Sequence, residues 1–198
     1  MRKFLCYAVA FLAMAMVMGA CSEKKGQASV NNEVSEPVKS KIQLNAEDSA
    51  FAVDVLGRYL NVSQAFADSA AATTGALNGG SAEGYLANKA HVDSVLHSCI
   101  DMVKQRNYDG LLSMLEKERT NIYVHPGNLI DNEIDLGILF GRMYNQVAGS
   151  EDDFYKRMLP IYEFTVTHMD MLVKMGNERH PDYEVIKGYY EVAKAHEK

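Results

Sequence analysis

The stretch NAEDSAFAVDVLGRYLNVSQAF, residues 45–66, decides the fold class of this chain. Its large apolar side chains return every three or four residues, the period of one face of an α-helix: Phe51, Val55, Tyr59, Val62 and Phe66. A strand would instead alternate apolar and polar residues with a period of two. Asn45, three residues before Asp48, offers the side chain of an N-cap. The stretch therefore predicts an amphipathic helix that begins after Asn45 and continues past Phe66.

The helical period resumes after a glycine-rich interruption at residues 73–84. It predicts five further helices, at about residues 85–105, 107–121, 129–147, 151–175 and 181–195. Asn107 and Ser150 stand before two of these segments as N-caps. The sequence has no hairpin signal and no alternating stretch of useful length. We therefore expect a single all-α domain over residues 45–198, a bundle or helical-hairpin array of about six helices with antiparallel neighbours.

The amino-terminal 21 residues have the layout of an export signal. Two basic residues precede an unbroken apolar run, which ends on a small pair followed at once by a cysteine. The segment Met18-Gly19-Ala20-Cys21 resembles the lipobox of bacterial lipoproteins. The resemblance implies that residues 1–20 are a signal peptide and that acylated Cys21 anchors the mature chain in a membrane. The alternative is an uncleaved anchor, because the apolar run is close to the lower length limit of a membrane span.

The same resemblance implies a location in the cell envelope. Ser22, directly after the cysteine, resembles lipoproteins sent to the outer membrane and so favours it over the inner membrane. The following segment is polar and contains Pro37, and it cannot bury enough apolar area to fold alone. We expect residues 21–44 to be a flexible tether between the lipid and the helical domain.

The charge and the cysteines of the mature chain exclude some classes of protein. Removal of Arg2 and Lys3 reduces the 20 basic residues to 18, against 26 acidic ones, which gives a formal charge of −8. Nucleic-acid binding needs a concentrated basic face, so we expect no nucleic-acid partner. Cys99 is left as a single thiol, and the domain must rely on its apolar core instead of a disulfide.

One helical face carries residues that bind soft metals elsewhere. His168, Met171 and Met175 are spaced by three and four residues, and imidazole with thioethers suits Cu(I). Methionine also fills apolar cores, and Leu172 and Phe164 share this face. The core interpretation is the simpler one, and we expect neither a bound metal nor another cofactor.

Two further features concern helix packing. Gly137 and Gly141 lie four residues apart inside a helix, where each costs about 1 kcal/mol relative to alanine. Close approach of a neighbouring backbone would offset this cost. Ordinary packing within the protein is one interpretation, and a ligand groove or a partner contact is the alternative. Pro160 interrupts an apolar period that continues on both sides, which predicts one long helix kinked near residues 156–160.

Tyrosines gather near the carboxyl terminus. Tyr183, Tyr189 and Tyr190 lie on the last helix, and tyrosine is common in recognition surfaces because it combines apolar area with a polar tip. The alternative is the edge of the core, with hydroxyl groups that reach water. We take these three tyrosines as the candidate partner-binding residues, since the last helix of a bundle has one neighbour fewer to cover it.

No catalytic motif accompanies these features: the sequence lacks a phosphate-binding glycine loop, a nucleophile elbow and a zinc-protease motif. We therefore expect a membrane-tethered envelope lipoprotein that acts as a protein-binding or assembly module. Two alternatives stay open, a small-molecule carrier with an apolar cavity between helices and an enzyme whose site is not visible in sequence. An exposed apolar groove would favour the module, a closed apolar cavity the carrier, and a cleft with converging ionisable groups the enzyme.

Overall fold

The computed structural model describes residues 40–78 and 82–197. Within them the chain forms seven helices and no strand: α1 (Ala46–Leu60), α2 (Gln64–Asn78), α3 (Ala82–Lys104), α4 (Tyr108–Tyr123), α5 (Ile130–Val147), α6 (Glu151–Lys174) and α7 (Tyr183–Ala195). The all-α prediction is confirmed. None of these helices combines the length and the apolar character of a membrane span. The lipobox-like segment with Cys21, and the tether as far as residue 39, lie outside the described residues.

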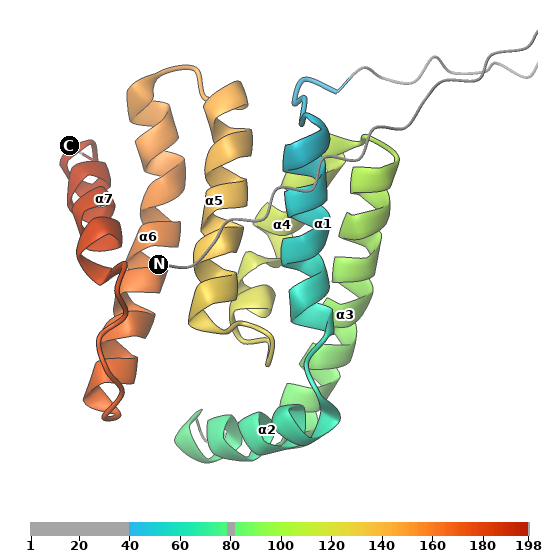
Figure 1. The fold of residues 1–198 in the computed structure, drawn as a ribbon, viewed down its shortest axis with the longest axis vertical. Helices are drawn as coiled ribbons and strands as arrows, with labels where there is room; N and C mark the ends of the chain where they lie inside the picture. The colour runs from blue at the N-terminus through green and yellow to red at the C-terminus, as the bar shows by residue number, and fades with distance from the viewer. Residues whose placement is uncertain (1–39, 79–81, 198) are drawn as a thin grey trace, which may run out of the picture. The chain divides into compact units, whose positions relative to one another are not determined.

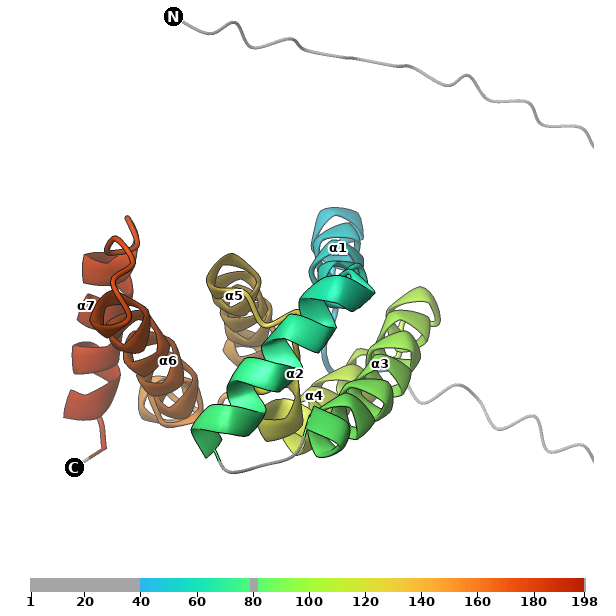
Figure 2. The ribbon, with the colours of Figure 1, turned by 90° about the horizontal axis from the view of Figure 1, so that it is seen from below.

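The helices pack mainly against their sequence neighbours. Helix α6 packs on both α5 and α7, and Figure 1 shows these three side by side. Helix α1 packs on α3 and α5, while α4 packs on α3 and α5. Helix α2 lies across the ends of the other helices, and Figure 2, seen from below, shows it crossing from α1 towards α6. It packs on α3.

The first predicted helix is two helices, and this part of the prediction is wrong. Helix α1 ends at Leu60, where the backbone N–H of Asn61 donates to the carbonyl of Gly57. Ser63 then caps α2, because its Oγ accepts the N–H of Phe66 at 3.2 Å. The chain turns between the two helices. Phe66 therefore does not lie on the same face as the buried Tyr59, and its side chain is exposed. Helix α2 also extends into the glycine-rich segment, as far as Asn78.

The domain begins before residue 45, which corrects the expected end of the tether. The side chain of Ile42 is 1% exposed, and Leu44 is also buried in the core. The backbone N–H groups of Lys41 and Ile42 donate to the carboxylate of Asp109 at 2.9 and 3.1 Å. Burial alone would raise the pKa of Asp109, but these two hydrogen bonds and the Ser40 hydroxyl outweigh it and lower that pKa. Residues 40–44 are therefore part of the folded domain.

The core is one large apolar cluster shared by α1, α3, α4, α5 and α6. A second, smaller cluster joins α6 to α7 and contains Val166, Met169, Tyr183 and Ile186. Helix α6 is continuous, as predicted, and carries Pro160 in its interior. The kink near residues 156–160 stays a prediction. Together α5, α6 and α7 form the frame of the first candidate site.

Candidate functional site

An apolar groove lies between α5 and α7, which both pack on α6. We call it the α5–α7 groove, and its volume is about 250 Å³. It is lined by Ile134, Gly137, Ile138 and Gly141 of α5, by Met158, Ile161, Tyr162 and Thr165 of α6, and by Asp182, Val185, Ile186 and Tyr189 at α7. An apolar cavity of about 150 Å³ is large enough for a benzene ring. The groove therefore has room for a large aliphatic or aromatic group.

The two helical glycines of α5 line this groove. A Cβ built on Gly137 would meet Cγ2 of Ile161 at 3.4 Å, and one built on Gly141 would meet Cε of Met158 at 3.8 Å. Side chains of α6, and not its backbone, thus approach these glycines. Both distances are ordinary van der Waals contacts, so the expected close approach of a neighbouring backbone is not found among the described residues, and both glycines line the groove.

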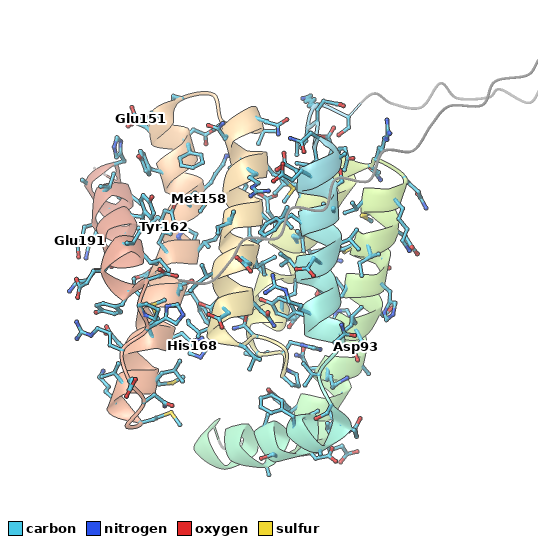
Figure 3. All side chains as sticks on the ribbon, in the orientation of Figure 1. Asp93, Glu151, Met158, Tyr162, His168 and Glu191 are labelled. Atoms are coloured by element: carbon cyan, nitrogen blue, oxygen red, sulfur yellow. The ribbon has the colours of Figure 1, made fainter. Side chains whose placement is uncertain are left out.

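Three apolar side chains of the α5–α7 groove are exposed, although large apolar groups are normally buried. Ile138, Val185 and Tyr189 belong to this set, and Tyr189 is 52% exposed. The Tyr189 ring stacks on the ring of Tyr162, with 5.8 Å between the centroids. Figure 3 labels Tyr162 and Met158 on the half of α6 that begins at Glu151. Asp182 is the one formally charged residue among those that line the groove.

The three candidate tyrosines separate into different environments. Tyr183 is only 4% exposed, and its hydroxyl donates to the Asp170 carboxylate at 2.8 Å. It belongs to the second apolar cluster, so its assignment to a partner-binding surface is corrected. Tyr190 packs against the same cluster. Of the three, Tyr189 alone lines the α5–α7 groove.

A second cleft lies between α2, the connection from α4 to α5, and α6. We call it the α2–α6 cleft, and its volume is about 540 Å³. Its lining comprises Phe66, Ala70, Tyr85, Tyr123, Val124, His125, Pro126, Asn128, Leu129, Phe164, Thr167, His168 and Met171. Figure 3 labels His168 further along α6 than Met158 and Tyr162, towards the carboxyl end of the helix. The two openings therefore use different stretches of the same helix.

Two of the candidate metal ligands meet at this cleft. His168 and Met171 both line it, while Met175 does not. The two methionines are 48% and 60% exposed, so the expectation that they fill the core is wrong. Within the described residues, no group of three or more His, Cys, Asp or Glu side chains is placed to hold a metal ion.

A buried polar cluster lies under the cleft and was not predicted from the sequence. The Glu133 side chain is fully buried, and its Oε2 accepts hydrogen bonds from Nδ1 of His168 and from the amide of Asn128, both at 2.7 Å. The hydroxyl of Tyr59 donates to Oδ1 of Asn128 at 2.8 Å. The available signal was the position of Glu133, three residues before Leu136 on the apolar stripe of α5.

His125 is a structural member of this region. Its Nε2 lies 2.8 Å from the Asp93 carboxylate, and its Nδ1 accepts the backbone N–H of Gly127 at 2.9 Å. Burial lowers the pKa of His125 more than the nearby Asp93 raises it. Both ring nitrogens are occupied, so His125 has no free nitrogen for a ligand or a proton transfer.

Cys99 has the properties of an inert core residue. It is fully buried, and burial, followed by the charge of Glu118, raises the pKa of its thiol to about 12. The thiolate that a nucleophile or a metal site needs is therefore not formed near neutral pH.

The comparisons with known proteins add no family. The chain matches no protein-family model, no curated protein and no solved structure.

Proposed function

We propose that this protein is a lipid-tethered protein of the cell envelope that binds a partner protein through the α5–α7 groove. The observation that carries the proposal is the set of exposed apolar side chains, Ile138, Val185 and Tyr189, around a groove floored by two glycines. Nearly all of the lining is apolar, so affinity would come from burial of apolar surface. Walls made of two helices suit a partner helix that inserts a large apolar side chain.

The amino-terminal resemblance supports the tether. An acylated Cys21 would hold the domain close to a membrane, and confinement raises the effective concentration of any partner in the same membrane. A weak contact through one small groove would then be sufficient. The acidic balance of the chain is consistent with a protein partner and unfavourable for nucleic acid.

Acylation of Cys21 is the first prediction. We expect the intact mass of the protein extracted from membranes to correspond to a chain that begins at Cys21 and carries lipid. Stable anchoring takes two or more acyl chains, since each buried methylene contributes only about 0.8 kcal/mol. The Cys21→Ser variant should retain its signal peptide and lack the lipid mass. An unmodified Cys21, or a mature chain that begins elsewhere, would contradict the lipid anchor.

Two exposed valines of α7 allow a matched test of the α5–α7 groove. Val185 lines the α5–α7 groove, whereas Val192 is exposed on the same helix and is not among the residues that line it. Val185→Asp places a charge against apolar surface and should reduce the recovery of a crosslinked partner about tenfold, because burying one such side chain contributes about 1.5–3 kcal/mol. Val192→Asp carries the same helix-propensity cost and should leave recovery nearly unchanged. Quantitative mass spectrometry after crosslinking in whole cells measures both.

Tyr189→Ala gives a second test of the same groove. The side chain is half-exposed, so the melting temperature should change little while partner recovery falls. Equal recovery from the wild type and from Val185→Asp and Tyr189→Ala would remove the groove from the proposal. Crosslinks between two copies of this chain would replace the partner by a self-association.

A further inference from the structure

Two buried polar atoms next to the α2–α6 cleft have no partner in the described part of the fold: one belongs to Tyr123, which lines the cleft, and one to Glu133, which binds the lining residue His168. The hydroxyl of Tyr123 and Oε1 of Glu133 are both buried and have no hydrogen-bond partner among the residues that the structure describes. Buried polar atoms nearly always have a partner, so each exception needs an explanation. Burial, followed by the negative charge of Glu133, raises the pKa of Tyr123. Its phenol therefore stays protonated and can donate a hydrogen bond as well as accept one.

The neighbouring polar groups separate into occupied and available ones. Both ring nitrogens of His125 are bonded. The amide of Asn128 donates to Glu133 and to the carbonyl of Tyr123, and its oxygen accepts from Tyr59. Nδ1 of His168 is held by Glu133, which leaves Nε2 as the ring nitrogen available to a ligand. In the tautomer that donates from Nδ1 to this carboxylate, Nε2 is an acceptor.

The charge of this region favours a cationic ligand over an anionic one. Among the residues that the structure describes, those that line the cleft include no lysine and no arginine. Directly behind His168 lies the fully buried carboxylate of Glu133. A buried carboxylate destabilises a nearby anion and stabilises a nearby cation.

The walls of the cleft are aromatic. Phe66, Tyr85, Tyr123 and Phe164 line it, and the rings of Tyr123 and Phe164 stack at 4.0 Å between centroids. Aromatic faces attract cations, and a desolvated site strengthens that attraction. Exposed apolar groups, among them Leu129 and Met171, complete the rim. The apolar rim can contact the hydrocarbon part of a ligand, and the polar groups beneath it can bind an ammonium group.

We propose that the α2–α6 cleft binds a small organic amine, with its apolar body against the aromatic walls and its ammonium group over the Glu133–His168 pair and the Tyr123 hydroxyl. The volume of about 540 Å³ falls within the range of about 300–1,000 Å³ that small-molecule sites occupy. The ammonium donates to Nε2 of His168, and its charge balances the carboxylate of Glu133. This site is separate from the α5–α7 groove and does not depend on the function proposed for it.

Two probes with the same ring and opposite charges test this site. Isothermal titration of the intact mature protein with 4-phenylbutylamine should give saturable binding of one equivalent. The same titration with 4-phenylbutyrate should give at least about tenfold weaker binding, because the acid would approach a buried carboxylate with no cation to receive it. Equal affinity for the two probes, or no binding of the amine at about 1 mM, would overturn the proposal.

Variants locate the binding. Tyr123→Phe removes an unpaired buried hydroxyl, so the melting temperature should hold or rise while the affinity for 4-phenylbutylamine falls at least about threefold. A hydroxyl with only a structural role would not change that affinity. Tyr155→Phe, on the far part of α6, is the matched control and should bind as the wild type does. Glu133→Gln keeps the shape of the side chain, removes the charge, and should reduce the preference for the amine over the acid about tenfold.

A variant at the exposed rim tests the same site even if the substitutions at Tyr123 and Glu133 unfold the protein. Phe66 is exposed, so Phe66→Ala should leave the fold intact and weaken binding of 4-phenylbutylamine at least about threefold. Binding that is unchanged in both Tyr123→Phe and Phe66→Ala would place the amine elsewhere and refute this cleft as its site.

Discussion

Gly127→Ala should lower the free energy of unfolding by about 3 kcal/mol, at the upper end of the range for overpacked sites. Gly127 lies in the connection between α4 and α5, and a Cβ at this position would come within 2.5 Å of the carbonyl oxygen of Tyr59 and 2.6 Å of its Cα. Both of these atoms belong to the backbone of α1. A side chain could rotate away from the added methyl group, but a helix backbone must shift as a whole. Chemical denaturation of the purified variant measures the loss.

Gly149→Ala is the matched control for this prediction. Gly149 also lies in a connection between helices, and a Cβ there would meet nothing within 4 Å. We expect its unfolding free energy to stay within about 0.5 kcal/mol of the wild type. If Gly127→Ala were equally mild, the close contact between this turn and α1 would be refuted. The carbonyl of Gly127 accepts from Asn132, and its N–H donates to His125. Through these two hydrogen bonds the turn supports the polar cluster beneath the α2–α6 cleft. Without the contact between the turn and α1, this support would not be rigid.

Helix starts were predictable wherever a local side chain determines them. The side chains of Asn45, Asn107 and Ser150 each cap the helix that the sequence assigned to them, by accepting the N–H three residues ahead. The same chemistry at Ser63 went unrecognised, because the apolar period continues across it through Val62 and Phe66. An apolar period shows which residues share a face only if the helix continues. One N-cap after a turn is enough to end one helix and begin another.

The candidate sites were less predictable, because exposure depends on how helices are oriented and not on their composition. Tyr183 and Tyr189 lie on one helix, yet the first is buried against α6 and the second lines the α5–α7 groove. Met171 and Met175 are of a residue type common in cores, but both lie near the end of α6 and are exposed. Glu133 lies on an apolar stripe, and only the folded chain brings it to His168, 35 residues away.

The start of the folded domain, residues 40–44 before α1, was also not predictable from local sequence. The polar composition of the segment before α1 suggested a tether as far as residue 44, since its apolar residues are few among many polar ones. In the folded chain the carboxylate of Asp109, at the start of α4, binds the backbone of this segment and holds Ile42 over the core. The partners are more than 60 residues apart in sequence, so no local pattern announces the contact.

Ile42→Ala should therefore lower the free energy of unfolding by about 2–5 kcal/mol, the usual loss for a buried isoleucine. A tether residue would give no such loss. Lys41→Ala is the matched control, because this neighbouring side chain is exposed and its backbone N–H to Asp109 is retained, so the change should be within about 0.5 kcal/mol. Chemical denaturation of both variants, in a chain that begins at residue 21, measures the difference. Equal stability of the two variants would return residues 40–44 to the tether, whereas the expected difference fixes the start of the folded domain ahead of α1.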